Sequence, residues 1–364
     1  MSRTALAIAL VLAAVLPLAG QDEPMPVDPT GALLRLETAF LDPPATGLLI
    51  TNVGPESQAA EAGIEAGDVL VSYGGRAVTD LDALNRAKED LAGEETVELT
   101  LTGPGGERTV TLRPGPIGVN CQPVAKGVPA ASLPTPTVTG FDFTQLAKGP
   151  FDDWYAFSLD GEEKVGFEHA RLALTLGKLV LRREVAFDGG EQFGVNHFDV
   201  TAIAVAGPPP DVFAVKFASP PSDFLASGRA LPGSRWLDRR FGAETVLTHP
   251  SDLPRIPTYL VESLAAFLPR EPGACFRFRP ITEGTGLAGI RSALVAVGEE
   301  EVRAGGEVAR AFRVEWRLLS GAVAGTYWLD GPGHALLVDY GGAMAWRTTR
   351  EKALEGLPPS IRPR

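Results

Sequence analysis

Apolar and polar residues follow two different patterns along the chain, one before and one after a proline-rich stretch. The first pattern mixes short apolar runs with segments of helical spacing. The run GLLITNV at Gly47–Val53 predicts a strand, and VLVSY at Val69–Tyr73 predicts a second one. Between them, Ser57 is placed to cap a short helix that Gly63 ends.

A longer helix and a hairpin complete this first block. Apolar residues recur at helical spacing within residues 79–91, which predicts an amphipathic helix. The residues at that spacing are Leu81, Leu84, Ala87 and Leu91. After Gly93, the stretch TVELTLTGPGGERTVTLR alternates, turns at a glycine-rich site and alternates again, as a β-hairpin does. We therefore expect a compact α+β domain over residues 31–113.

The second pattern covers residues 141–364 and consists of short runs with a period of two, separated by glycine-containing turns. Such alternation predicts antiparallel strands. One segment differs: PTYLVESLAAFLPR has the spacing of a helix, with Thr258 as its cap and Pro269 as its stop. We expect a mainly antiparallel β-sheet domain with one helix lying on or across the sheet.

Residues 114–140 separate the two blocks. Their prolines and small residues are unsuited to a helix or a sheet interior, so this stretch is interpreted as an exposed, semi-extended linker. The chain is thus predicted to be multi-domain, with an α+β domain, a linker and a β-sheet domain in that order.

The N-terminus has the features of a secretory signal peptide over residues 1–20. Arg3 supplies a positive charge, residues 5–18 are apolar, and small residues follow. We therefore expect an exported protein, periplasmic or extracellular. An uncleaved membrane anchor is the alternative. No later segment reaches the roughly 18 apolar residues of a membrane-spanning helix, so the mature protein is expected to be soluble.

Charge and cysteine content narrow the possible partners. The 364 residues carry a net charge of −12, which argues against nucleic acid as a partner because phosphates require a basic surface. The two cysteines, Cys121 and Cys275, could pair in an exported chain, but their separation in sequence leaves this open. Neither belongs to a CxxC spacing.

The first block contains a motif of a known family. The stretch SQAAEAGIEAGD, residues 57–68, together with the flanking strands and the helix over 79–91, resembles the PDZ domain in the permuted form found in exported bacterial HtrA-type proteases. The resemblance implies a small, partly open β-barrel with two helices. It also implies that an extended peptide, usually a C-terminus, adds a strand to one sheet edge while its carboxylate lies in a loop of backbone N–H groups.

The same resemblance implies positions for this peptide site. The family's carboxylate loop precedes the first strand, which points to Gly31, Ala32, Leu33 and Leu34, with Leu36 in the strand that follows. The helix would form the other wall of the groove through Leu81, Asn85 and Lys88. The sequence departs from the family pattern, because Leu33 replaces the second glycine of the loop. A PDZ fold that serves only as a rigid spacer is the alternative.

The second block resembles, more loosely, uncharacterised exported β-sheet domains that accompany transglutaminase-like or lipoprotein-carrier-like proteins. The segments that carry the resemblance are GEEKVGFEHARL, PTYLVESLAAFLP and GTYWLDGPGHALLVDYGGAMAWRTTREKAL. No catalytic residue follows from it. A curved sheet could hold an apolar ligand on its concave face, and the alternative is that the predicted helix covers this face.

Sequence motifs of common enzymes are missing. There is no HExxH, GxSxG or GxxxxGK[ST] motif, and His169, His197, His249 and His334 are scattered. We therefore expect a non-enzymatic exported protein without cofactor or metal, which binds extended or C-terminal peptides and offers the β-sheet domain as a second interaction surface. Two alternatives remain open: a hydrolase with its site in the C-terminal sheet and the PDZ domain as substrate tether, or a carrier of an apolar ligand.

Overall fold

The structure is a computed structural model in which two compact units follow each other along the chain, with the boundary between Ser132 and Leu133. It describes residues 29–363 except 131, 141–148, 162, 177, 191–193, 206–212, 220–223, 232–234, 241–242, 249–251, 282–287 and 331–333. The predicted signal peptide lies outside these residues. No described helix is long and apolar enough to cross a membrane.

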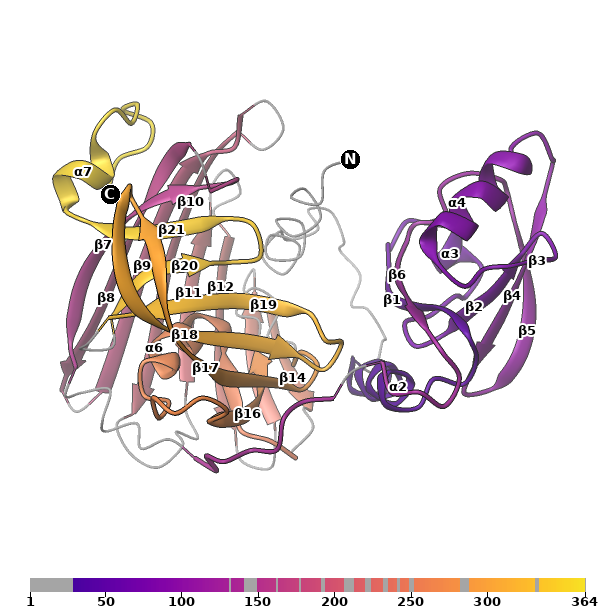
Figure 1. Cartoon of the computed structure of the whole chain (residues 1–364), viewed down its shortest axis with the longest axis horizontal. Coiled ribbons are helices and arrows are strands. Elements are labelled where there is room, and N and C mark those ends of the chain that lie inside the picture. Colours follow the sequence, from indigo (N-terminus) through magenta and orange to yellow (C-terminus); the bar gives the residue numbers. More distant parts are fainter. Residues whose placement is uncertain are drawn as a thin grey trace. The chain divides into compact units, whose positions relative to one another are not determined.

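The first unit is a six-stranded sheet with three helices (Figure 1). The strand order is β5-β4-β2-β1-β6, and β3 pairs with β2. The strands are β1 (Gly47–Val53), β2 (Val69–Tyr73), β3 (Arg76–Ala77), β4 (Val97–Gly103), β5 (Gly106–Leu112) and β6 (Val119–Val124). The helices are α2 (Pro29–Leu41), α3 (Gln58–Glu61) and α4 (Leu81–Asp90).

The strands and helices expected from the hydrophobic pattern of this unit are confirmed. The Ser57 side chain accepts a hydrogen bond from the N–H of Ala60 and so caps α3, and Gly63 follows it with a φ of 68°. Asp68 of the AGD sequence is buried and bonds the N–H of Glu65 at 2.9 Å, which closes the turn before β2. These contacts are local, so the residues of the motif determine them directly.

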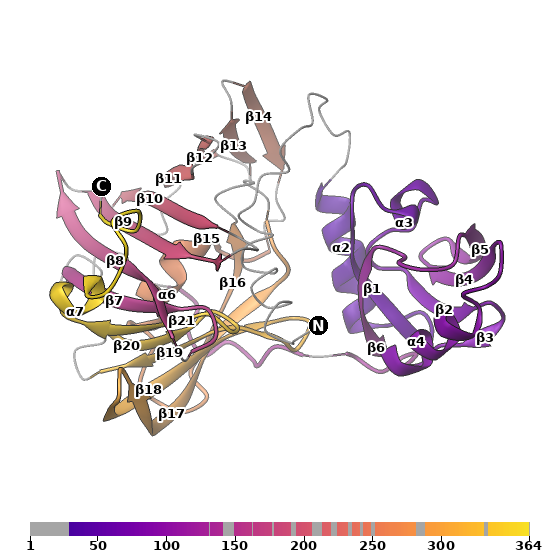
Figure 2. The same cartoon turned by 90° about the horizontal axis from the view of Figure 1, so that it is seen from above.

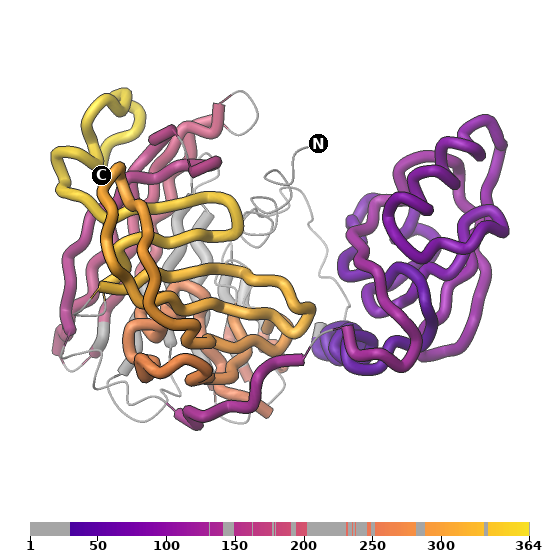
Figure 3. Tube along the Cα trace, in the orientation of Figure 1, coloured from indigo at the N-terminus to yellow at the C-terminus, as the bar shows by residue number. Residues whose placement is uncertain are grey.

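Two predictions about the borders of this unit are wrong. Gly31, Ala32, Leu33, Leu34 and Leu36 lie in helix α2, and not in a carboxylate loop followed by a strand. Residues 114–140 are not a linker throughout, because strand β6 lies within them and pairs with β1. Both errors have one cause: the strand that was sought before β1 in the chain follows β5 instead. Figure 3 shows the Cα path of β6 running beside β1.

The second unit is a single 15-stranded sheet, which confirms the predicted antiparallel β domain; only β15 and β16 pair in parallel. The strand order is β14 to β7 in descending sequence, followed by β21 to β15. The strands of the first half are β7 (Phe151–Ser158), β8 (Lys164–Thr175), β9 (Lys178–Asp188), β10 (Val195–Val205), β11 (Phe213–Ser219), β12 (Phe224–Leu231), β13 (Arg235–Arg240) and β14 (Ala243–Thr248). Those of the second half are β15 (Arg255–Pro257), β16 (Cys275–Ile281), β17 (Ser292–Ala304), β18 (Glu307–Leu318), β19 (Val323–Leu329), β20 (Ala335–Asp339) and β21 (Met344–Thr348).

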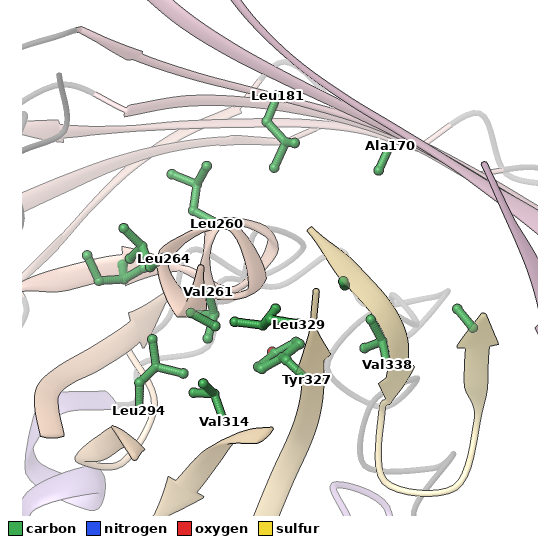
Figure 4. Packing of buried hydrophobic residues seen from close by; sticks show 14 of the residues in the cluster. Ala170, Leu181, Leu260, Val261, Leu264, Leu294, Val314, Tyr327, Leu329 and Val338 are labelled. Atoms are coloured by element: carbon green, nitrogen blue, oxygen red, sulfur yellow. The ribbon is translucent and has the colours of Figure 1, made fainter. Parts of the chain in front are cut away.

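A helix forms in the predicted segment and packs on the inner face of this sheet. It differs from the prediction in two details, because the cap position is Pro257 instead of Thr258 and the helix ends at Ala265, before Pro269. It consists of a 3-10 turn, Thr258–Leu260, continued by α6, Val261–Ala265. Figure 2 shows the sheet curving around α6, and Figure 4 shows Leu260 and Leu264 between strands of the two halves. Leu260, Val261 and Leu264 are each at most 2% exposed. The helix therefore packs against part of the inner face.

The outer face carries a short C-terminal helix, α7 (Arg350–Leu354). The Thr349 side chain caps it by accepting from the N–H of Lys352. Ala353, Leu357 and Ile361 pack with Phe167 and Ala186 of the sheet in a small separate cluster. Because successive side chains of a strand point to opposite faces, Phe167 faces this cluster while Glu168 faces the interior.

Candidate functional site

Strand β6 forms one edge of the sheet in the first unit. It pairs with β1 over residues 119–124, and within the described residues no strand pairs with its other side. An edge strand presents its outward N–H and C=O groups to any further strand that approaches. The open edge predicted beside Leu33 is thus found at β6, at the other end of the domain's sequence.

Alternate residues of β6 direct their backbone groups away from β1. The N–H of Gly54 donates to the carbonyl of Gly118 at 2.8 Å, and Asn120 directs its carbonyl to Thr51 of β1. In an antiparallel pair the residues between such positions face the open side, so Val119 and Cys121 offer an N–H and a carbonyl there. Pro123, the next outward residue, has no N–H, which limits the length of a guest strand.

Two hydrogen bonds connect the loop before β6, residues 115–118, to helix α3. The carbonyl of Ile117 accepts from the N–H of Ala59 at 3.2 Å. The side chain of Gln58 donates to the carbonyl of Pro116 at 3.0 Å and accepts from the N–H of Arg113 at 2.9 Å. Because α3 supplies Gln58 and Ala59, the capped helix positions the loop directly.

Gly118 is required by the shape of this loop. Its φ is 83°, a region that residues with a side chain rarely adopt, and a Cβ placed there would lie 2.2 Å from the Cβ of Ser57. The N–H groups of Ile117 and Gly118 donate to no acceptor among the described residues. Successive free amides at a turn form a concave site for an anion such as a carboxylate.

The three helix residues that were expected to face a peptide lie in α4. Leu84 and Ala87 are buried in the core, which leaves Leu81, Asn85 and Lys88 on the neighbouring face at a spacing of four and three residues. Leu81 and Asn85 are exposed, and Lys88 is half-buried. The structure therefore brings the three predicted helix residues to one face of α4.

The Lys88 side chain of α4 and the Cys121 thiol of β6 influence each other's pKa. Burial lowers the pKa of the Lys88 ammonium, and the Cys121 thiol beside it partly raises that pKa again. Burial likewise raises the pKa of the Cys121 thiol, against a smaller lowering by Lys88. The mutual influence indicates that the Lys88 ammonium lies near the Cys121 thiol of β6, and Cys121 packs against the core that contains Leu84 and Ala87 of α4.

The sequence analysis missed Ile117, Gly118, Val119 and Cys121 as site residues. Their signal is GPIGV, residues 115–119, in which an apolar residue and a glycine precede an apolar residue at the start of a strand. The residues chosen instead pack elsewhere: a Cβ at Gly67 would lie 3.3 Å from backbone atoms of Arg35 and Leu36. Helix α2 thus covers the turn before β2 and supplies no strand.

A second cluster of titratable groups lies inside the second unit. The Nη2 of Arg183 donates to Glu262 Oε2 at 2.6 Å, and its Nη1 lies 3.2 Å from Glu168 Oε1. The hydroxyl of Tyr340 donates to Glu168 Oε2 at 3.0 Å and accepts from Arg183 Nη1 at 3.0 Å. The three charged residues are between 1% and 7% exposed. They join strands β8 and β9 to helix α6.

Burial and pairing set the charges of this cluster. Burial raises the pKa of Glu168 to about 7; Arg183 counteracts this in part, and Glu262 adds to it. Burial lowers the pKa of Arg183, but Glu262 and Glu168 outweigh it, so the pKa rises well above its ordinary value and the guanidinium stays charged. The arrangement is a buried ion network that fixes α6 to the sheet.

Two histidines of the second unit meet aspartates. His169 Nε2 lies 2.6 Å from Asp152 Oδ1, and His334 Nδ1 lies 3.1 Å from Asp153 Oδ2. The two aspartates are neighbours in β7, so the pairs lie on opposite faces of the sheet. Within the described part of the chain neither histidine bonds a hydroxyl or a thiol, so these pairs do not support the hydrolase alternative. There, no three His, Cys, Asp or Glu residues gather closely enough to hold a metal ion.

The two cysteines are free thiols in the structure. Cys121 belongs to β6 in the first unit, and Cys275 is buried at the start of β16 in the second. The N–H of Cys275 donates to the Thr137 hydroxyl at 2.9 Å, and burial raises the pKa of its thiol. The disulfide that the sequence left open is not formed.

Comparisons with known proteins identify the family of the first unit. No curated protein matches the chain significantly. A solved structure described as a beta-barrel-like protein of a domain of unknown function, DUF1849, from Brucella abortus is similar with a TM-score of 0.38 and 13% identity, over 55% of this chain and 96% of that one. The PDZ domain family model matches residues 49–102, from β1 to β4. The first unit of this chain therefore contains a PDZ domain.

Proposed function

We propose that this protein binds the C-terminal peptides of partner proteins in the groove between β6 and α4. The open edge of β6, which begins directly after a loop with free amides, is the observation that carries this proposal. A guest strand would pair antiparallel with Val119 and Cys121, and its terminal carboxylate would accept from the N–H groups of Ile117 and Gly118. Peptide binding agrees with the PDZ match over residues 49–102.

The remaining parts of the proposal concern location and the second unit. We infer export from the N-terminal pattern of Arg3 followed by apolar residues, and a non-enzymatic role from the missing sequence motifs of common enzymes. The β-sheet domain would act as a second interaction surface; its inner face is filled by α6, so its outer strands would make the contacts.

A peptide-binding experiment tests the groove. The mature full-length chain would be screened by fluorescence polarisation against a library of labelled peptides with free C-termini. The best binder would then be compared with its C-terminal amide, which cannot place a carboxylate on the loop. We expect amidation to weaken binding at least tenfold. Equal affinity of acid and amide would overturn the proposed carboxylate site.

Two protein variants locate the site. Gly118→Val places a side chain against Ser57 and changes the loop, so we expect binding to be lost. Gly31→Val changes helix α2, outside the groove, and we expect full affinity. Circular dichroism and thermal melts would confirm that both variants fold. Loss of binding in Gly31→Val alone would move the site to α2 and contradict the groove.

A further inference from the structure

Lys88 is a half-buried cation of α4 that no carboxylate among the described residues neutralises. The described residues contain no ion pair of Lys88. Its neighbours at helical spacing on α4 are Leu84, Asn85 and Leu91, none of them acidic. Two acidic residues follow Lys88 directly. Glu89 is exposed and, as the next residue on the helix, does not share the face of Lys88, and Asp90 is paired with Arg76.

Other cations of the first unit are either paired or solvated. Arg35 pairs with Glu65 at 3.0 Å, and Arg108 pairs with the buried Asp68 at 2.6 Å. Arg86 and Arg113 are exposed and hydrated by solvent. Lys88 differs from these residues because it has lost part of its hydration without gaining an opposite charge. A partly desolvated, unpaired ammonium is unfavourable, and an incoming carboxylate would remove that cost.

The position of Lys88 defines which part of a guest peptide it can reach. Its ammonium is near enough to the Cys121 thiol to influence the pKa of that thiol, and Cys121 packs against the same core as Leu84 and Ala87 of α4. Cys121 lies two residues along β6 from Val119, where the guest's terminal residue would pair. Guest residues opposite Val119 and Cys121 are separated by one residue, so Lys88 is placed beside the last three residues of the guest. The terminal carboxylate itself is received by the amides of Ile117 and Gly118, which leaves Lys88 for a side chain.

Resting on the proposed function, we propose that Lys88 makes this groove selective for C-termini with an aspartate or glutamate side chain among their last three residues. The partner class is thus a protein with an acidic C-terminal end. Asn85 and Leu81, one and two turns earlier on α4, face upstream guest residues and carry no charge, so the charge selection is confined to the end of the peptide.

The test compares matched peptides that differ in one charge. Starting from the best library binder, glutamate and glutamine are exchanged at each of the last three positions, and dissociation constants are measured with the mature full-length protein. We expect glutamate to bind about tenfold more tightly than glutamine at one or more of these positions. With Lys88→Met we expect this ratio to fall close to one. With Lys88→Glu we expect a lysine-bearing peptide to become the preferred guest.

Arg86→Met serves as the matched control, because Arg86 is an exposed cation on the same helix without an ion pair. It should leave the glutamate-to-glutamine ratio unchanged. The peptide series tests Lys88 even if a variant at this position folds poorly, since only the guest changes there. As a second readout, the pKa of the Lys88 ammonium, followed by NMR, should rise on addition of the glutamate peptide and not of the glutamine peptide.

The outcomes separate this inference from the proposed function. Peptides that bind through a free C-terminus with equal affinity for glutamate and glutamine would overturn the role of Lys88 and leave the groove intact. A loss of affinity in Lys88→Met that is equal for all peptides would also overturn it, because Lys88 would then contact the terminal carboxylate. Binding of no peptide, acidic or neutral, would instead overturn the proposed function.

Discussion

Two cations that are withdrawn from water, Lys88 in the first unit and Arg183 in the second, have opposite surroundings. Arg183 is almost fully buried and contacts two glutamates and a tyrosine hydroxyl. Lys88 is half-buried and contacts no carboxylate among the described residues. The second unit thus satisfies its buried charge internally, whereas the first unit leaves a charge for a partner to satisfy.

The sheets of the two units differ in the same way. The sheet of the second unit folds around α6, so its inner face is filled by the chain itself (Figure 4). The sheet of the first unit ends at β6, whose outward groups face a groove. Removing one member of a complete buried ion network leaves an uncompensated buried charge, whereas a partly desolvated cation without a partner favours a ligand of opposite charge. Within the described residues, the second unit pairs its buried cation and packs α6 against its inner face, and the first unit keeps an open sheet edge.

The largest effect is expected from removing the paired cation. Arg183→Met leaves Glu168 and Glu262 buried without a counter-charge, which should lower the free energy of unfolding of the second unit by about 3–5 kcal/mol. Arg182→Met is the control: Arg182 is half exposed and lies 3.4 Å from Asp199, so its loss should cost about 0–1 kcal/mol. Urea unfolding measures both variants. If both variants lowered the free energy of unfolding by the same small amount, the network around Arg183 would contribute little to stability. Arg183 and Lys88 would then no longer differ in this respect.

The pH dependence of stability should show the raised pKa of Glu168. In the unfolded chain Glu168 loses its proton near pH 4.5, whereas the folded protein keeps it up to about pH 7. The folded state therefore binds more protons between these values, so stability should fall as pH rises from about 4.5 to 7 and then level off. The loss is on the order of 3 kcal/mol.

The variant Glu168→Gln isolates this contribution, because other carboxyl groups titrate in both proteins. The difference in the free energy of unfolding between variant and wild type should change with pH over the same interval and be constant above about pH 7. A difference that stays flat from pH 4.5 to 7 would mean that Glu168 titrates normally in the folded protein.

An intermediate effect is expected from the loop of the groove. Gly118→Ala introduces a Cβ against Ser57 at a backbone φ of 83°, and should weaken C-terminal peptides at least tenfold. Gly93→Ala, at a site with nothing within 4 Å of the added Cβ, should leave binding unchanged. Isothermal titration calorimetry measures both. Retained binding in Gly118→Ala would show that the loop geometry is not required.

The smallest change in stability is expected from replacing Lys88, and it distinguishes this residue from Arg183. Lys88→Met replaces a partly desolvated, unpaired charge by an apolar side chain of similar length, so the stability of the first unit should rise slightly or stay the same, within about 1 kcal/mol. The thermal midpoint of the mature chain without peptide is the measurement. A clear destabilisation would show that Lys88 has a structural partner, and the two cations would then be alike.

Local patterns were sufficient for most of the first unit. The motif at residues 57–68 determines a capped helix, a glycine turn and the aspartate that closes it, because these contacts join residues close in sequence. They were not sufficient for β6. Its sequence, VNCQPV, contains a proline and little alternation, and its partner β1 lies about 70 residues earlier in the chain, as the pairing of Val53 with Val119 shows.

The prediction of the site followed the same division. Leu81, Asn85 and Lys88 were chosen because the resemblance makes this helix a wall of the peptide site, and the structure places the three residues on one face of α4. Their role in binding stays a prediction. The carboxylate loop was sought at Gly31–Leu34 because the resemblance placed it before β1, although the spacing of Leu33, Leu36 and Phe40 is that of the helix α2 that forms there. The prediction followed the order of elements expected for the family and ignored the helical spacing of these residues. The helical spacing gave the correct structure.

The sequence by itself determined the two units, the antiparallel class of the second and the PDZ motif of the first, because burial of apolar faces imposes a period of two or 3.6 residues. The tertiary structure decided which strand forms the open edge and which charged groups meet. Arg183, Glu168 and Glu262 are far apart in the chain and meet only in the folded protein. The position of Lys88 near Cys121 of β6 likewise follows from the fold and not from the sequence around Lys88. Contacts between residues far apart in the chain depend on which strands pair in the folded sheets. Such pairing produces no periodic pattern of apolar residues in the sequence.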